Sequence, residues 1–113
     1  MGIFAHLRKL RAFEQRHLAF LLTLEDFDVV HAIGMHQEGG ALLTLKHMLA
    51  YDIGSVATLQ RRLARLKRLG VVLESRSAHD RRNVHLELSP RTLRTFQRYS
   101  ALLGAAASDS APD

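Results

Sequence analysis

The sequence predicts a mainly α-helical domain with one small β-hairpin. Apolar residues recur at three- and four-residue steps along most of the chain, as they do in amphipathic helices. One segment, residues 71–88, instead contains two β-prone runs joined by a polar turn. The chain has 113 residues, of which 47% are hydrophobic. This length and composition suit one domain with a real core.

We expect a first helix at about residues 3–22. It is longer than the core of a small domain requires, and Phe4, Leu7 and Leu10 lie along its N-terminal half. This half is therefore a candidate dimerisation surface. A simple lid over the chain's own core is the alternative interpretation.

The next segments predict a helix-turn-helix. Thr23 and Asp26 form a capping-box pattern for a second helix that extends to about Gln37. A short edge strand is expected at 41–43, and a third helix at 45–51, capped by Thr44. The sequence Asp-Ile-Gly at 52–54 predicts the turn into a fourth helix.

The fourth helix, which Ser55 would cap, presents a basic face. Leu59 lies at the centre of its apolar stripe, so helical geometry places small and basic residues on the opposite side. Arginine binds guanine edges and phosphates, and alanine lets a helix approach base edges closely. A solvated basic face is the alternative, but no acidic residue lies between Asp52 and Glu74. The candidate DNA contacts on this helix are Ser55, Ala57, Thr58, Arg61, Arg62, Arg65 and Arg68.

The β-prone runs at 71–76 and 84–88 predict a hairpin with its tip near residues 78–82. Arg81 and Arg82 at the tip are candidate DNA contacts, since an arginine can enter a narrow minor groove. Asp80 is expected to hold the turn in shape. The order of helix, strand, basic turn and strand is that of a winged helix.

Ser89 and Pro90 predict the start of a last helix, as N-cap and first helical residue. Its apolar face includes the candidate dimerisation residues Phe96, Tyr99 and Leu103. The pattern weakens at Gly104, so we expect the chain to fray beyond it. The expected organisation is a dimerisation helix at 1–22, a winged helix-turn-helix at 23–90, a second dimerisation helix at 91–107 and a frayed tail at 108–113.

The positive charge is concentrated in the second half of the chain. Residues 55–98 contain eleven Lys or Arg and three acidic residues, a net charge of +8, whereas the whole chain carries +5. The remaining residues therefore carry −3. This asymmetry favours a polyanionic partner for the basic half.

Several other classes of protein are not expected. Without cysteine the chain has no disulfide or thiolate site, which fits a reducing compartment such as the cytoplasm. Its seven histidines lack the spacing of a metal site, so no metal and no cofactor are expected. No catalytic motif is present, so we expect no enzyme. Charges interrupt the N-terminal segment, which predicts no signal peptide, and no apolar run reaches the roughly 18 residues of a membrane span.

The run D-R-R-N-V-H-L-E-L-S at 80–89 resembles the wing signature D-x-R-x-x-x-x-x-L-T of MarR-type winged-helix regulators. Asp80, Arg82 and Leu88 match this signature, and Ser89 replaces its threonine. The resemblance implies a homodimeric transcription regulator whose terminal helices intertwine. It also implies that the helix after Ser55 enters the major groove, that Arg82 reaches the minor groove and that Asp80 steadies the wing.

The sequence thus predicts a regulator that binds a pseudo-palindromic site on double-stranded DNA as a homodimer. A winged-helix module that binds protein and a non-specific nucleic-acid binder are the alternatives. A small-molecule effector is compatible with the sequence, but no residue supports one.

Overall fold

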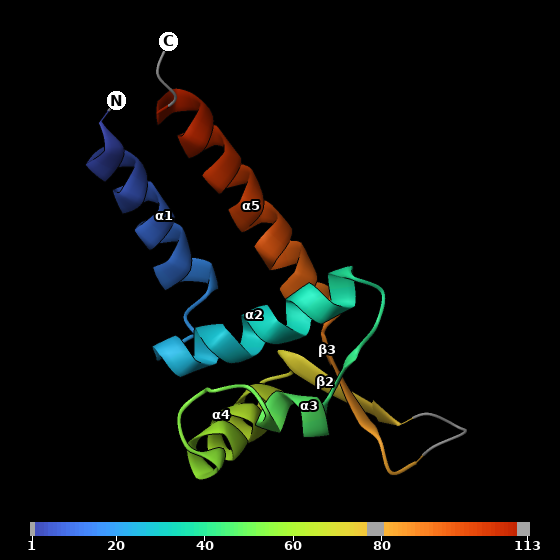
Figure 1. Ribbon diagram of the computed structural model, residues 1–113. Coiled ribbons are helices and arrows are strands. Elements are labelled where there is room, and N and C mark those ends of the chain that lie inside the picture. Colours follow the sequence, from blue (N-terminus) through green and yellow to red (C-terminus); the bar gives the residue numbers. More distant parts are fainter. Residues whose placement is uncertain (1, 77–80, 111–113) are drawn as a thin grey trace. The chain divides into compact units, whose positions relative to one another are not determined.

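The chain forms two compact units, which are described separately. The computed structural model describes residues 2–76 and 81–110, without the side chains of 106–110. The terminal unit consists of Met1–Ala19 and Pro90–Asp113, and the central unit is Phe20–Ser89. Figure 1 shows the elements along the chain. The predicted class, mainly helical with a small sheet, is confirmed.

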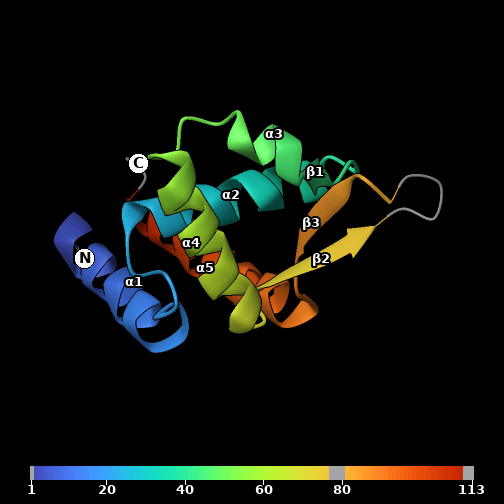
Figure 2. The same cartoon turned by 90° about the horizontal axis from the view of Figure 1, so that it is seen from below.

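The central unit contains the helix-turn-helix and a three-stranded antiparallel sheet. The sheet has the order β1-β3-β2, so β3 lies between a very short edge strand and its hairpin partner. Figure 2 shows the hairpin extending beside α4. The elements are α2 (Leu24–Glu38), β1 (Leu43–Thr44), α3 (Leu45–Leu49), α4 (Val56–Arg68), β2 (Val72–Arg76) and β3 (Val84–Leu88).

Short local signals set the helix boundaries in this unit. Thr23 and Asp26 form a full capping box at the start of α2. Thr44 accepts a hydrogen bond from the His47 backbone, and Ser55 caps α4. These caps satisfy backbone N–H groups that have no partner within a helix. Gly70, with φ +73°, allows the chain to turn from α4 into β2.

The core of the central unit joins α2, α4 and the sheet. The centre of the apolar stripe of α4 is buried, with Leu59, Leu63 and Leu66 all at most 3% exposed, whereas Val56 and Leu69 at the two ends of the stripe are 55% and 54% exposed. Gln37 on α2 adds a polar link, because its Oε1 accepts a hydrogen bond of 2.8 Å from the Leu88 backbone. The other large buried side chains of the unit are Val29, Val30, Ile33, Leu43, Met48, Val72 and Leu86. Burying one such side chain stabilises a fold by about 1.5–3 kcal/mol.

The terminal unit pairs two helices, α1 (Ile3–His17) and α5 (Pro90–Ser110). Tyr99 joins them by donating a hydrogen bond of 2.7 Å to Glu14 Oε2. Its ring stacks on Phe13, with centroids 5.5 Å apart. The guanidinium carbon of Arg98 lies over the same Phe13 ring, 5.5 Å from its centroid. Tyr99, predicted as a dimerisation residue, thus makes these contacts within its own chain.

Several predicted boundaries differ from the observed ones. α1 ends at His17 rather than near residue 22, and the backbone N–H groups of Leu22 and Thr23 bind the Asp26 carboxylate rather than helical carbonyls. α5 continues past Gly104 to Ser110. Three alanines follow this glycine, and alanine has the highest helix propensity. α3 ends two residues earlier than expected, and β1 is displaced toward Thr44.

Replacing Tyr99 with Phe should destabilise the terminal unit by about 1–2 kcal/mol, because the hydrogen bond to a carboxylate is lost. Burial, followed by the interaction with Glu14, raises the pKa of Tyr99 to about 12 from 10.0. The neutral phenol is therefore favoured in the folded state, and its contribution is complete below pH 10 and lost as the pH rises through 12. Thermal unfolding at pH 8 and pH 11 measures both effects.

Tyr51→Phe is the matched control, since Tyr51 is exposed and its hydroxyl contacts His36 in the central unit. A Tyr99→Phe variant that unfolds at the wild-type temperature at pH 8 would contradict the assignment of this hydrogen bond.

Candidate nucleic-acid interface

The predicted basic face of α4 is exposed. Ala57, Arg61, Ala64 and Arg68 are all accessible, and they lie opposite the buried leucines of the helix. We call these four residues the α4 outer face. Figure 2 shows α4 along the outside of the central unit. Because two of the four residues are alanines, little side-chain bulk covers the helix axis between the arginines.

The N-terminal end of α4 is held by a small hydrogen-bond network. Ser55 Oγ accepts a bond of 3.1 Å from the Thr58 backbone, and it donates a bond of 3.0 Å to Thr58 Oγ1. Arg61 Nη2 lies 3.4 Å from the same Thr58 oxygen. Ser55 therefore acts as a cap, and Thr58 restrains the arginine one turn later. Such restraint lowers the entropy that Arg61 would lose on binding.

A shallow hollow runs along the side of α4. Four arginines and Ala64 line it, and an exposed guanidinium group favours an anion. Arg61 and Arg68 belong to the α4 outer face, and Arg62 is half-buried at its margin. The predicted residues Arg61, Arg62, Arg65 and Arg68 are thus brought together on one surface.

Arg65 differs from the other arginines of this hollow, because its charge has partners inside the unit. Its Nη1 donates a hydrogen bond of 2.6 Å to the Phe20 carbonyl. The same nitrogen lies 3.6 Å from Asp26 Oδ2, and the Arg65 side chain is only 25% exposed. Asp26 itself is fully buried. The sequence predicted Arg65 as a DNA contact, but the structure turns its guanidinium toward the start of α2.

The hairpin β2–β3 carries the second group of predicted contacts. Arg81 and Arg82 are exposed, whereas Asp80 lies outside the described residues. Arg76 on β2 donates a hydrogen bond of 2.6 Å to the Arg81 carbonyl, so it fixes the chain just before the predicted Arg82 contact. Lys67 and Glu74 form an ion pair of 2.8 Å that joins the end of α4 to β2.

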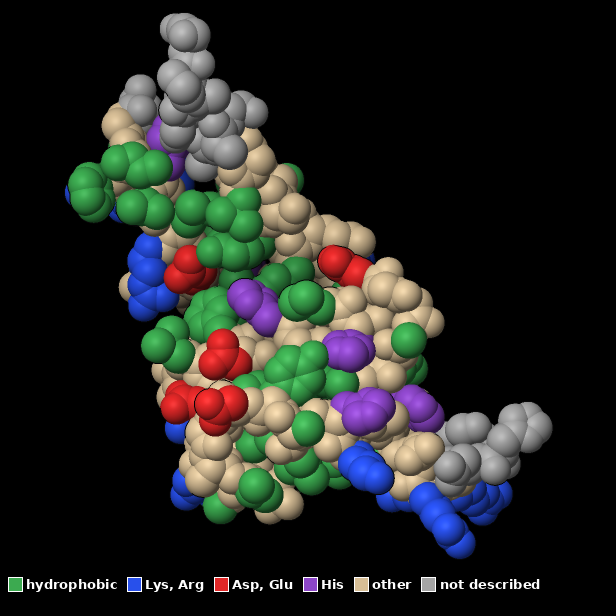
Figure 3. Space-filling view, viewed as in Figure 1, with side chains coloured by type: hydrophobic (Ala, Val, Ile, Leu, Met, Phe, Trp, Pro, Cys, Tyr) green, Lys and Arg blue, Asp and Glu red, His purple; other side chains and the backbone are tan. Residues whose placement is uncertain are grey.

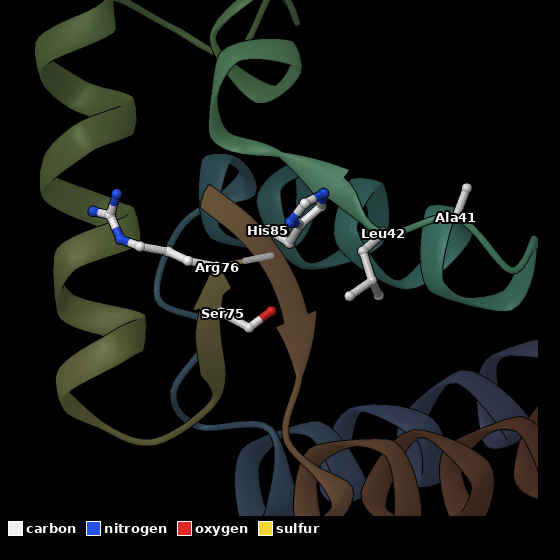
Figure 4. A pocket seen from close by; sticks show the side chains of 5 residues that line it. All are labelled: Ala41, Leu42, Ser75, Arg76 and His85. Atoms are coloured by element: carbon white, nitrogen blue, oxygen red, sulfur yellow. The ribbon is translucent and has the colours of Figure 1, made fainter. Parts of the chain in front are cut away.

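A second hollow lies on the sheet, between the segment before β1 and the hairpin. Ala41, Leu42, Ser75, Arg76 and His85 line it. Figure 4 shows the Arg76 side chain extending toward α4, away from His85 and Ala41. The polar groups of this hollow therefore do not converge on a common point, as they would in a site for a small ligand.

Three residues that support this interface are not predicted as functional from the sequence. Arg76 donates a hydrogen bond across the hairpin to the Arg81 carbonyl. Glu74 accepts a hydrogen bond from Lys67 at the end of α4. Asp26 was recognised only as a capping residue, and its pairing with Arg65 joins positions 39 residues apart. Local spacing gives no signal for such a pair. The alternation of the strands could have placed Glu74 and Arg76 on one face of β2.

The predicted dimerisation residues differ in exposure. Phe4 is 79% exposed, Leu7 46% and Leu103 44%. Figure 3 shows hydrophobic side chains gathered over α1. Leu10 is buried, and Phe96 and Tyr99 are half-buried. Among the described residues of the terminal unit, the large exposed hydrophobic side chains are Ile3, Phe4, Leu7 and Leu103.

Among the described residues, no three His, Cys, Asp or Glu side chains are grouped as a metal site would require. In the same part of the chain, none of the helices has the length and apolar character needed to cross a membrane.

Comparisons with known proteins agree with this geometry. A family model described as "Winged helix DNA-binding domain" matches residues 21–92. The crystal structure of MarR is 22% identical, with a TM-score of 0.55, over 95% of this chain and 79% of that chain. The S. aureus MepR-DNA complex is 18% identical, with a TM-score of 0.69. The match covers 96% of this chain and 81% of that chain. A MarR-like regulator from Bacillus cereus is 13% identical, with a TM-score of 0.54. The match covers 94% of this chain and 77% of that chain. No curated protein matches the sequence.

At these identities the structural matches establish a shared fold. The predicted resemblance to MarR-type winged-helix regulators is confirmed at that level.

Proposed function

Because the chain belongs to the winged helix DNA-binding domain family, we propose that it is a transcriptional regulator that binds specific sites on double-stranded DNA as a homodimer. The observation that carries this proposal is the α4 outer face, where exposed arginines alternate with alanines. A helix of this kind fits the major groove, whose base edges present a distinct pattern for each base pair.

In the proposed complex, α4 lies in the major groove with its outer face toward the bases. Ala57 and Ala64 allow close approach, and Arg61, restrained by Thr58, binds a base edge. Arg62 and Arg68 bind phosphates on either side of the groove. The proposed contacts of the helix are Ser55, Ala57, Thr58, Arg61, Arg62 and Arg68.

The hairpin reaches the DNA beside α4 and supplies a second set of contacts. Arg81 and Arg82 are proposed to enter the adjacent minor groove, where the negative potential is strongest if the groove is narrow. Arg76 supports this position of the two arginines, because it donates a hydrogen bond to the Arg81 carbonyl. Asp80 keeps the role that the wing signature implies, as the residue that steadies the turn.

The exposed apolar surface of the terminal unit supports the proposed homodimer. Phe4, Leu7 and Leu103 would be covered by the same residues of a second copy, because most protein dimers are two-fold symmetric. Two recognition helices related in this way read half-sites about 34 Å apart, or one turn of DNA. The expected site is therefore a pseudo-palindrome.

The proposed function involves no catalytic step and no cofactor. A cytoplasmic location is part of the proposal, because the cysteine-free composition fits a reducing compartment.

Replacing Arg82 with Ala should weaken binding to all duplexes and reduce the slope of log K against log salt by about 0.9, the value expected for one lost phosphate contact. Fluorescence anisotropy at several salt concentrations measures this slope. Arg8→Ala is the control, since Arg8 is exposed on α1 in the terminal unit. If the slopes of the two variants are equal, the Arg82 charge does not lie against the DNA.

A further inference from the structure

We propose that Arg65 is a positioning residue that fixes the rotation of α4 on the central unit, so that sequence specificity depends on the buried Asp26. This inference rests on the proposed DNA-binding function, and it assigns Arg65 a role other than direct contact with DNA.

The geometry places the Arg65 charge against the start of α2. Its Nη1 lies between two acceptors, the Phe20 carbonyl at 2.6 Å and Asp26 Oδ2 at 3.6 Å. The same Asp26 oxygen accepts hydrogen bonds from the Leu22 and Thr23 backbones at 2.8 and 3.2 Å. One guanidinium group and one carboxylate thus tie α4 to the turn that begins the central unit.

Asp26 needs this cation. The residue is fully buried, and its Oδ1 has no hydrogen-bond partner among the described residues. A buried carboxylate is costly unless it is paired, and Arg65 forms an ion pair with it. If Arg65 turned outward to a phosphate, Asp26 would lose its counterion. The pair therefore holds Arg65 inward when DNA is bound.

The position of Arg65 on the helix explains why this affects specificity. Arg61 lies four residues before it and Arg68 three residues after it, so the three residues are neighbours on the helix surface. A fixed Arg65 sets the direction in which the α4 outer face points. Base edges are read by bidentate bonds that tolerate little displacement, whereas phosphate contacts carry little sequence information.

The test compares four variants with the wild-type chain: Asp26→Asn, Arg65→Lys, Arg65→Ala and Arg68→Ala. Two quantities are measured by anisotropy, the preference for a selected duplex over a random duplex and the slope of log K against log salt. Arg68→Ala is the control for a phosphate contact, because Arg68 is exposed on the same helix. Circular dichroism confirms that each variant is folded at the temperature of the binding experiment.

We expect Asp26→Asn and both Arg65 variants to lower the preference about tenfold with an unchanged slope, while Arg68→Ala lowers the slope by about 0.9. A change that only lowered the folded fraction would weaken both duplexes equally and leave the preference intact. Lysine replaces arginine well as a point charge on a phosphate but lacks its planar fork. Arg65→Lys keeps the inference testable if Arg65→Ala does not fold.

The inference is overturned if Arg65→Ala lowers the salt slope like Arg68→Ala, or if Asp26→Asn keeps the wild-type preference. Failure of the proposed function has a different signature, since the wild-type chain would then show neither a preference among duplexes nor a salt-dependent affinity.

Discussion

Replacing Ala64 with Glu is expected to reduce binding to duplex DNA about 100-fold or more. Ala64 lies on the α4 outer face between Arg61 and Arg68, which are three residues before it and four after it. A glutamate there would pair with these arginines and bring a negative charge toward the phosphates. Placing like charges together across an interface costs several kcal/mol. Anisotropy with a labelled duplex measures the loss.

The matched control is Ala12→Glu, which makes the same substitution at an exposed position of α1. It should leave the DNA affinity within about twofold of wild type, since surface changes outside a contact have small effects. Equal losses for the two variants would mean that net charge, rather than the α4 outer face, governs binding.

The second large effect is expected from Phe4→Glu, which should convert the proposed homodimer into a monomer. Phe4 is 79% exposed, and a charge in its place cannot be buried against a second copy without a partner. Loss of the dimer also removes the advantage of binding two half-sites at once, which amounts to about 10²–10⁴ in affinity. Analytical ultracentrifugation measures the oligomeric state, and anisotropy measures the affinity for a complete site.

Leu24→Glu provides a close control, because Leu24 is also 79% exposed but belongs to the central unit. It lies in the first turn of α2, where an acidic residue is favourable to the helix dipole. This variant should remain dimeric. If wild type and Phe4→Glu sediment alike, the α1 surface is not the dimer interface.

Features that depend on neighbouring residues could be predicted from the sequence. Thr23, Thr44 and Ser55 were recognised as helix caps because a cap needs only a side-chain oxygen and a nearby backbone N–H. The burial of Leu59 and the exposure of Arg61 follow from helical periodicity alone. These local rules were sufficient for the helix-turn-helix, the hairpin strands and the basic face.

Features that depend on distant residues could not be predicted. The sequence places Arg65 beside the basic face, but only the fold shows that Phe20 and Asp26 occupy its guanidinium. Likewise, Tyr99 matched the apolar pattern of a dimer surface, yet its hydroxyl contacts Glu14, 85 residues away. Periodicity identifies the side of a helix that is covered, and it does not identify the partner that covers it.

The most direct test of the central claim is selection of bound sequences from a random duplex pool by the wild-type chain, with the affinity of the pool measured at several salt concentrations. We predict a steep fall in affinity as salt increases, because arginines of α4 and the hairpin displace counterions from phosphates. We also predict enrichment of a pseudo-palindrome whose half-sites are one helical turn apart. An affinity that hardly changes with salt, together with an unenriched pool, would contradict the assignment of α4 and the hairpin as a specific DNA-binding surface.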